Sequence, residues 1–177
     1  MKLTAPALLL IAIAVAGCTA NVPSDAVSTA ELSYPAEYSS LDDLRGGATS
    51  VVLAHVVSSE EIMFLEVPHT RTTMQVDKTL AGEDLDSFVL RQLGGATLVA
   101  SDGPKTIGKS GTYLLYITDF TFGPDEPSTG EHVIVGPGAW VKRGEGRFEA
   151  WLNSKPSVPG LPLSVNQEAL DAIAVRK

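Results

Sequence analysis

The sequence predicts a mainly β fold, either a small antiparallel barrel or a sandwich, with a short N-terminal helical turn and a C-terminal helix. Short β-branched or alternating segments recur about every ten to twenty residues between Ser50 and Leu152, separated by glycine and proline, which is typical of barrels and sandwiches. Long helical segments do not alternate with these strands, so a parallel α/β sheet is not expected.

A short helix is expected before the strands. Ser40 is a suitable N-cap, Asp42 and Asp43 would lie in the first turn, and Gly46-Gly47 would end the helix after one or two turns. The next segment, Ser50 to Ser58 (SVVLAHVVS), is nearly continuously β-branched and apolar. It predicts a strand that is buried on both faces.

The following segments alternate and predict strands with one wet face. Thr70 to Leu80 would bury one set of side chains and expose the other, and Ser87 to Leu93 repeats the pattern. The expected buried residues are Thr72, Met74, Val76, Phe88 and Leu90, and the expected exposed ones are Arg71, Thr73, Gln75, Asp77 and Arg91.

The later strands are shorter. Gly111 to Phe120 (GTYLLYITDF) is the most hydrophobic of them. Three more are expected at Glu131 to Val135, Ala139 to Arg143 and Arg147 to Leu152, with a glycine-bearing hairpin at 144–146 joining the last two.

A helix over 165–175 is expected to end the domain. Pro156, Pro159 and Pro162 exclude regular structure before Ser164. The segment Ser164-Val165-Asn166-Gln167 has the form of a capping box, in which the serine and glutamine side chains satisfy free backbone N–H groups. The apolar stripe of this helix would pack across the strands as a lid and would consist of Val165, Ala169, Ala172 and Ile173.

The N-terminal segment has the order of a secretory signal peptide. Lys2 precedes an apolar run from Ala5 to Ala16, and small residues follow at the cleavage point. A transmembrane helix is the weaker interpretation, because Leu3 to Gly17 holds only 15 residues and contains Pro6, whereas a span needs about 20. The better rival is an ordinary signal peptide with an incidental cysteine.

Val15-Ala16-Gly17-Cys18 resembles the lipobox of bacterial lipoproteins, and Cys18 is the single cysteine of the chain. The resemblance implies cleavage between Gly17 and Cys18, a diacylglycerol thioether on Cys18, and usually an acyl chain such as palmitate on the new amino terminus. It places the protein on the extracytoplasmic side of a bacterial membrane. The expected organisation is a signal peptide (1–17), a lipidated tether (18–38) and one β-rich domain (39–177).

Composition limits the partners. The net charge is −8, and without residues 1–17 it becomes −9, from 12 Lys and Arg against 21 Asp and Glu. The basic residues are scattered, so we expect no nucleic-acid partner. Membrane residence would depend on the lipid, since anionic lipid surfaces repel such a chain.

Four further segments resemble the OB-fold barrel of the netrin and tissue-inhibitor-of-metalloproteinase type. The resemblance covers about residues 48 to 152 and implies an OB-like barrel, not a particular activity, because this fold hosts unrelated functions. The segments are Val51 to Val57, Val76 to Gly82, Gly108 to Tyr116 and Gly138 to Val141.

Gly103 to Ser110 fits the phosphate-loop pattern GxxxxGK[ST]. A phosphate loop opens a helix, whose N-terminal amides hold the phosphates. Here the sequence after Ser110 is typical of a strand, so we interpret the segment, with Lys109, as a loop and expect no bound nucleotide.

We predict no catalytic residues, cofactor or metal. His55, His69 and His132 lie on different elements without metal-ligand spacing. Solvation is expected for three acidic pairs: Asp42-Asp43, Glu60-Glu61, and Asp84 with Asp86. Asp125-Glu126, near Gly130-Glu131, offers oxygens of the kind that bind calcium, but no ligand periodicity supports a calcium site. Trp140 and Trp151 would either fill the interior, which is favoured, or stack on a sugar or a partner protein.

These observations favour a membrane-anchored, non-enzymatic binding module for an envelope protein or a glycan. The alternative is an envelope hydrolase whose site is dispersed in the sequence. A cleft that gathers a histidine with carboxylates would favour the hydrolase.

Overall fold

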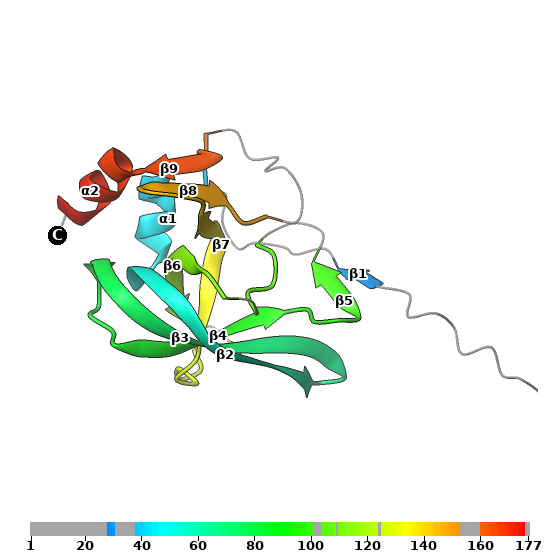
Figure 1. Cartoon of the computed structure of the whole chain (residues 1–177). Helices are drawn as coiled ribbons and strands as arrows, with labels where there is room; N and C mark the ends of the chain where they lie inside the picture. The colour runs from blue at the N-terminus through cyan, green and yellow to red at the C-terminus, as the bar shows by residue number, and fades with distance from the viewer. Residues whose placement is uncertain are drawn as a thin grey trace, which may run out of the picture.

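The computed structural model describes residues 28–30, 38–100, 104–108, 110–123, 125–152 and 160–175. Cys18, the rest of the lipobox and Lys109 lie outside these residues. Figure 1 shows the elements in chain order: β1 (Ser28–Ala30), α1 (Leu41–Gly47), β2 (Ser50–Phe64), β3 (Val67–Gly82), β4 (Ser87–Leu93), β5 (Leu98–Ala100), β6 (Thr112–Asp119), β7 (His132–Lys142), β8 (Arg147–Ala150), β9 (Ser164–Asn166) and α2 (Gln167–Val175).

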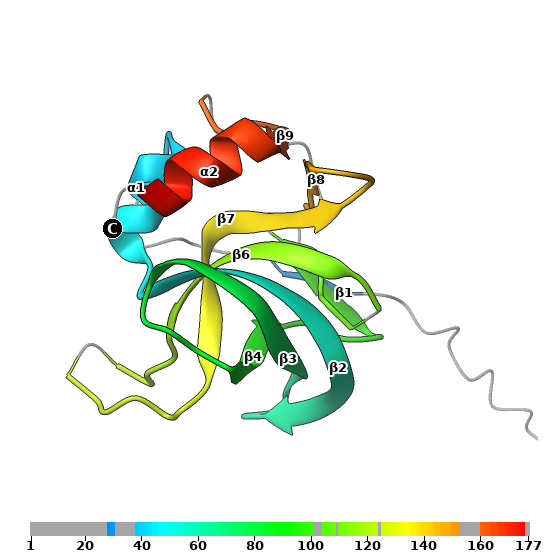
Figure 2. The same cartoon turned by 60° about the vertical axis from the view of Figure 1, so that its left-hand side comes forward.

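Seven strands form one sheet that partly closes into a ring. Their order is β4-β3-β2-β6-β7-β8-β9, and all neighbours in this order are antiparallel. The ring is closed by a parallel bridge between β4 and β7, at Leu90 and His132. Figure 2 shows β2, β3 and β4 curling below β6 and β7, with α1 and α2 at the top. The predicted fold class is confirmed: the protein is mainly β, its antiparallel sheet closes partly into a ring, and a short helix precedes the ring and another helix ends the domain.

The strands β2 and β3 form one long curled hairpin, which is longer than the two predicted segments. They pair from Ser50 opposite Gly82 to Phe64 opposite Val67, with three register shifts that allow the ribbon to bend. The prediction that 50–58 is buried on both faces is wrong beyond its first half, because Val57 is 61% exposed. Only the first part of β2 is covered by β6 as well as β3.

The predicted inner faces of β3 and β4 are confirmed, with one error. Thr72 and Met74 are buried on β3, and Phe88 and Leu90 on β4. The prediction that Arg91 is exposed is wrong, since only 7% of this residue is accessible.

One bent strand, β7, replaces two predicted strands. The chain passes through Gly136-Pro137-Gly138 without leaving the sheet. At Gly138 a Cβ atom would lie 2.7 Å from the Val135 carbonyl oxygen and 2.9 Å from the Tyr116 Cβ, so the bend needs a glycine. The predicted hairpin at 144–146 is present, and β8 pairs with β7 through it.

The C-terminal helix begins later than predicted. Val165 is a strand residue opposite Phe148, and its side chain is buried in the core. The Asn166 Oδ1 accepts a hydrogen bond from the Ala169 N–H at 3.0 Å, so Asn166 is the N-cap and the predicted capping box is wrong. The helix buries Leu170 and Ile173, whereas Ala172, which was predicted to be buried, is exposed.

Two hydrophobic clusters stabilise the fold. One lies between the sheet and the helices and includes Leu44, Trp140 and Leu170, and the other lies inside the ring and includes Met74 and Leu115. The burial expected of Trp140 is confirmed. The predicted N-cap of α1 is also confirmed, because Ser40 Oγ accepts a hydrogen bond from the Asp43 N–H at 3.1 Å.

Part of the segment predicted to be a tether meets the domain. Residues Ser28–Ala30 pair in parallel with Leu98–Ala100 and form a separate two-stranded sheet. Within the described residues, neither helix is long and apolar enough to cross a membrane.

Candidate binding site

The structure separates the three histidines. His55 on β2 contacts Asp77 (Nδ1 to Oδ1, 2.7 Å), and His132 at the start of β7 lies 3.5 Å from Asp119. His69 on β3 packs edge-on against Phe64. Among the described residues there is no group of three or more His, Cys, Asp or Glu that could hold a metal ion.

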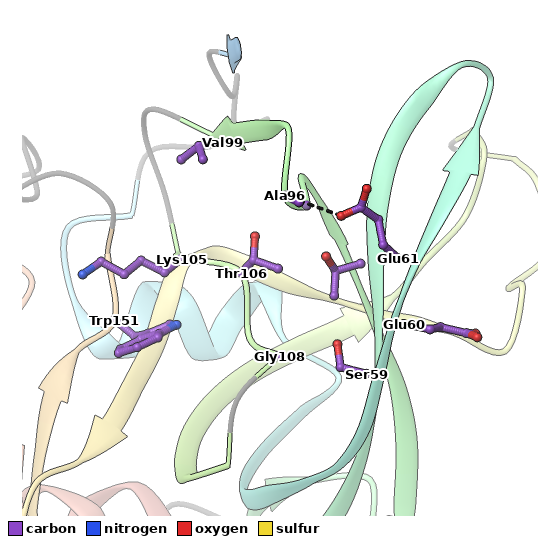
Figure 3. A pocket seen from close by; sticks show the side chains of 11 residues that line it. Ser59, Glu60, Glu61, Ala96, Val99, Lys105, Thr106, Gly108 and Trp151 are labelled. Atoms are coloured by element: carbon purple, nitrogen blue, oxygen red, sulfur yellow. Dashed lines mark hydrogen bonds between the residues drawn. The ribbon is translucent and has the colours of Figure 1, made fainter. Parts of the chain in front are cut away.

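The paired carboxylates have separate local roles. The Asp43 carboxylate accepts hydrogen bonds from the Ser39 hydroxyl (2.7 Å) and N–H (3.1 Å) at the start of α1. Hydrogen bonding to Ser39, and to a lesser extent to Ser40, lowers the pKa of this carboxyl group. Glu60 and Glu61 lie on opposite sides of β2, as Figure 3 shows. A shared pair that could act as acid and base is therefore not formed at either place.

Within the segment that fits the phosphate-loop pattern, Ile107 packs into the hydrophobic cluster inside the ring. Ile107 is fully buried, its N–H donates to Gln92 Oε1 at 2.8 Å, and its carbonyl accepts a hydrogen bond from the Thr72 hydroxyl. The chain then enters β6, so a strand follows, as predicted, and not a helix with a free N-terminus.

A groove of about 550 Å³ lies beside this segment. Figure 3 shows Ser59 and Glu61 on the side of β2 that faces the groove, with Thr106 and Trp151 across from them. The Glu61 carboxylate accepts a hydrogen bond from the Ala96 N–H at 2.6 Å. The groove is lined by Ser59, Glu60, Glu61, Thr70, Gly95, Ala96, Val99, Lys105, Thr106, Gly108 and Trp151.

Trp151 is only partly buried, so the expectation of burial holds less well for it than for Trp140. Its ring packs edge-on against Tyr113, with 5.8 Å between centroids, and Lys105 Nζ lies 5.2 Å from its centroid. Burial raises the pKa of the Tyr113 hydroxyl. Within the described part of the chain, no histidine lines this groove, so its hydroxyl groups have no neighbouring imidazole base.

An ion-pair network, buried at Arg91, largely buried at Glu131 and exposed at Glu60, lies on the other side of the β2–β3 hairpin. Glu131 accepts from Arg71 Nε at 2.7 Å and from Arg91 Nη1 at 3.0 Å, and Arg71 also reaches Glu60 at 2.9 Å. The burial of Arg91 that the sequence did not predict follows from this pairing. Burial lowers the pKa of His69 nearby, the positive charge of Arg91 lowers it further, and Glu131 partly offsets both effects.

Aromatic rings enclose the Arg91 guanidinium. Its Cζ lies 4.5 Å from the centroid of Phe64 and 4.9 Å from that of Phe120. Phe64 in turn stacks on Phe122, with centroids 5.2 Å apart. Arg91 thus ties the end of β2 to the β6–β7 connection.

Beyond this network, large apolar side chains remain uncovered at the end of the hairpin. The exposed fractions are 64% for Met63, 81% for Leu65, 36% for Val67 and 60% for Phe122. We call these four residues the apolar tip. Single exposed apolar residues are common, but a group of them at one end of a domain is typical of an interaction surface.

The turn of this hairpin has an unfavourable backbone. Leu65 and Glu66 connect β2 to β3 with φ angles of 48° and 64°, in the left-handed region. Two-residue hairpin turns with this geometry favour Asn-Gly, because a left-handed conformation costs other residues roughly 1–2 kcal/mol each. Burial does not offset this cost, since Leu65 is the most exposed residue of the tip.

Sequence reasoning missed the tip because its signals were weak. The chain around Leu65-Glu66 lacks the Asn-Gly or Asp-Gly signature of a hairpin, and Ser58 to Glu61 interrupts the apolar pattern. The segment Ile62-Met63-Phe64-Leu65 was the available signal, as an apolar run between two predicted strands.

Comparisons with known protein families, with curated proteins and with solved structures find no match to this chain.

Proposed function

We propose that the chain is a bacterial envelope lipoprotein, anchored by lipid on Cys18 at the extracytoplasmic side of the membrane. Its β-rich domain is then a non-enzymatic binding module for another envelope protein. The lipobox supports the anchor, and the apolar tip supports the binding role. We further propose that the ring is an OB-type barrel, since five strands in the order β4-β3-β2-β6-β7 with a parallel closure fit that architecture.

The apolar tip is the observation that carries the binding role. Its residue types, aromatic, Leu and Met, are large enough to fill a partner's pockets, and aromatic residues and Met are enriched at interfaces. They are held on a braced base, because Phe64 and Phe122 stack beside the enclosed Arg91. A pre-ordered surface loses less conformational entropy on binding.

A photo-crosslinking residue in place of Phe122 tests this role in cells of the bacterium that encodes the chain. We expect illumination to join the lipidated protein to one protein partner, with a defined mass shift. The matched control carries the same group in place of Leu163, which is 60% exposed and far from the tip in sequence. Equal products at both positions, or a glycan adduct at 122, would contradict the proposed protein-binding role.

A further inference from the structure

We infer that the Leu65-Glu66 turn enters the partner, and that the partner offers it an apolar pocket rimmed by Lys and Arg. This inference rests on the proposed function and adds to it the element that makes contact and the chemistry of the partner. The two observations that carry it are the strained turn and the distribution of charge around it.

In the domain alone, burial of Leu65 does not offset the cost of this turn, because the Leu65 side chain is 81% exposed. An Asn-Gly pair would form the same turn between Phe64 and Val67 with less strain. Instead the chain places Leu65, an apolar side chain that is 81% exposed, at the apex. A conformation kept against its cost, with no packing to stabilise it, is typical of a contact that forms only in a complex.

The two chain segments that supply the tip carry charge of one sign, and the cations beside them, Arg71 and Arg91, are paired with Glu60 and Glu131. The chain has no Lys or Arg from residue 46 to 70 or from residue 110 to 141, and these two segments supply the whole apolar tip. The same segments expose Glu60, Glu61, Glu66, Asp125 and Glu126. Glu66 adjoins Leu65 and forms no ion pair or hydrogen bond with any described residue. A partner that covers Leu65 must accommodate this carboxylate, which favours a cationic rim.

Two other occupants fit this surface less well. An anionic membrane would attract the apolar side chains but repel the adjacent carboxylates. In a two-fold symmetric dimer through the tip, Glu66 of each copy would approach the acidic tip of the other. A basic, pocketed protein satisfies both the apolar and the acidic residues.

The test uses the full-length lipidated chain with the crosslinker at position 122. The amount of crosslinked product then measures contact with the partner close to the Leu65-Glu66 turn. We expect Leu65→Asn and Glu66→Lys each to reduce the crosslinked product at least about tenfold, as for residues that dominate an interface. The matched controls are Leu163→Asn and Glu145→Lys, which make the same chemical changes at exposed positions outside the tip. They should leave the product unchanged.

A second variant separates binding from folding. Leu65→Asn/Glu66→Gly should raise the thermal unfolding midpoint by about 4 °C, because it relieves two left-handed residues, and should still abolish the crosslink. A crosslink at 122 that persists in all of these variants would overturn the inference while leaving the proposed function intact. Loss of the crosslink on Leu65→Asn but not on Glu66→Lys would overturn the cationic rim.

The membrane alternative has its own readout. Unlipidated chain that begins at Thr19, and so lacks both the apolar run of the signal peptide and Cys18, should not bind vesicles of phosphatidylglycerol. Vesicle binding that depends on Leu65 would overturn the inference in favour of a lipid surface.

Discussion

Arg91 shows how a single residue can support a surface that it does not itself form. It is a buried cation whose charge is met by Glu131 and whose guanidinium lies between Phe64 and Phe120. Removal of one partner from a buried ion pair leaves an uncompensated charge, which is far more costly than removal of both. The pair therefore holds the base of the apolar tip in place.

We expect Glu131→Ala to lower the free energy of unfolding by about 3 kcal/mol. Arg91→Met/Glu131→Ala should cost less than the sum of the two single changes, because the double variant leaves no unpaired Arg91. Urea unfolding of the four proteins in this cycle measures the coupling. The control Glu126→Ala, on an exposed carboxylate, should change stability by less than about 0.5 kcal/mol. If the stability losses of the two single variants add up to that of the double variant, the proposed role of the Arg91–Glu131 pair is contradicted.

His69 predicts a pH dependence with a definite sign. Its pKa in the folded protein is lowered, mainly by burial and by the charge of Arg91, while Glu131 opposes the shift. The unfolded chain, with a pKa of about 6.5, therefore binds the proton more readily. Stability should fall as the pH drops from 7.5 to 5, since protonation of His69 favours unfolding. In His69→Gln, urea unfolding over this range should show a shallower loss, and an unchanged slope would refute the assignment.

For single residues, the alternating pattern of a strand predicts which side chains face the core, but it does not predict which distant side chains they contact. It indicated that Phe88 and Leu90 are buried, and the same rule wrongly placed Arg91 in solvent. The burial of Arg91 depends on Glu131, forty residues later, and on rings from two further segments. Such a contact has no local signal.

Among the elements, the C-terminal helix shows how packing overrides a capping motif. Ser164 has a capping-box sequence, but its backbone pairs with Glu149 in the sheet. Strand formation through Ser164–Asn166 buries Val165 in the core. Asn166, which directly follows Val165, is therefore the N-cap of the helix.

This reassignment predicts different costs for two similar changes. Asn166→Ala should reduce the free energy of unfolding by about 1 kcal/mol, the usual value of an N-cap. Ser164→Ala, at an exposed strand position, should change it by less than about 0.5 kcal/mol. Thermal or urea unfolding of the two variants distinguishes them. A larger loss of stability for Ser164→Ala than for Asn166→Ala would contradict this assignment and support the predicted capping box.

The long hairpin was predicted only in part, for a related reason. The apolar and alternating halves, 50–58 and 70–80, carried clear strand signals, whereas 59–69 combines acids with an apolar run and an atypical turn. If the tip is a binding element, its residues are selected for a partner and not for the hairpin. Local rules then fail at the site that matters for function.

For the whole molecule, the fold class could be predicted because it depends on strand spacing and on the absence of alternating helices in the sequence. The closure of the ring could not, since the parallel bridge between β4 and β7 joins residues 42 positions apart. The site was also invisible, because the tip combines a turn near residue 65 with a side chain at 122. Only the folded chain brings these together.

The proposed lipid on Cys18 predicts how the whole molecule would be held at a membrane. In the proposed lipoprotein the acyl chains on Cys18 are the anchor, because the chain without residues 1–17 has a net charge of −9 and is not attracted to anionic lipid. We expect Cys18→Ser to abolish incorporation of labelled palmitate and to leave the chain uncleaved or released from the membrane fraction. The wild-type protein should remain in the membrane fraction in 1 M salt. At about this concentration, electrostatic attraction is screened within a few ångströms. Undiminished labelling of Cys18→Ser, or release of the unchanged protein by salt, would refute the lipid anchor.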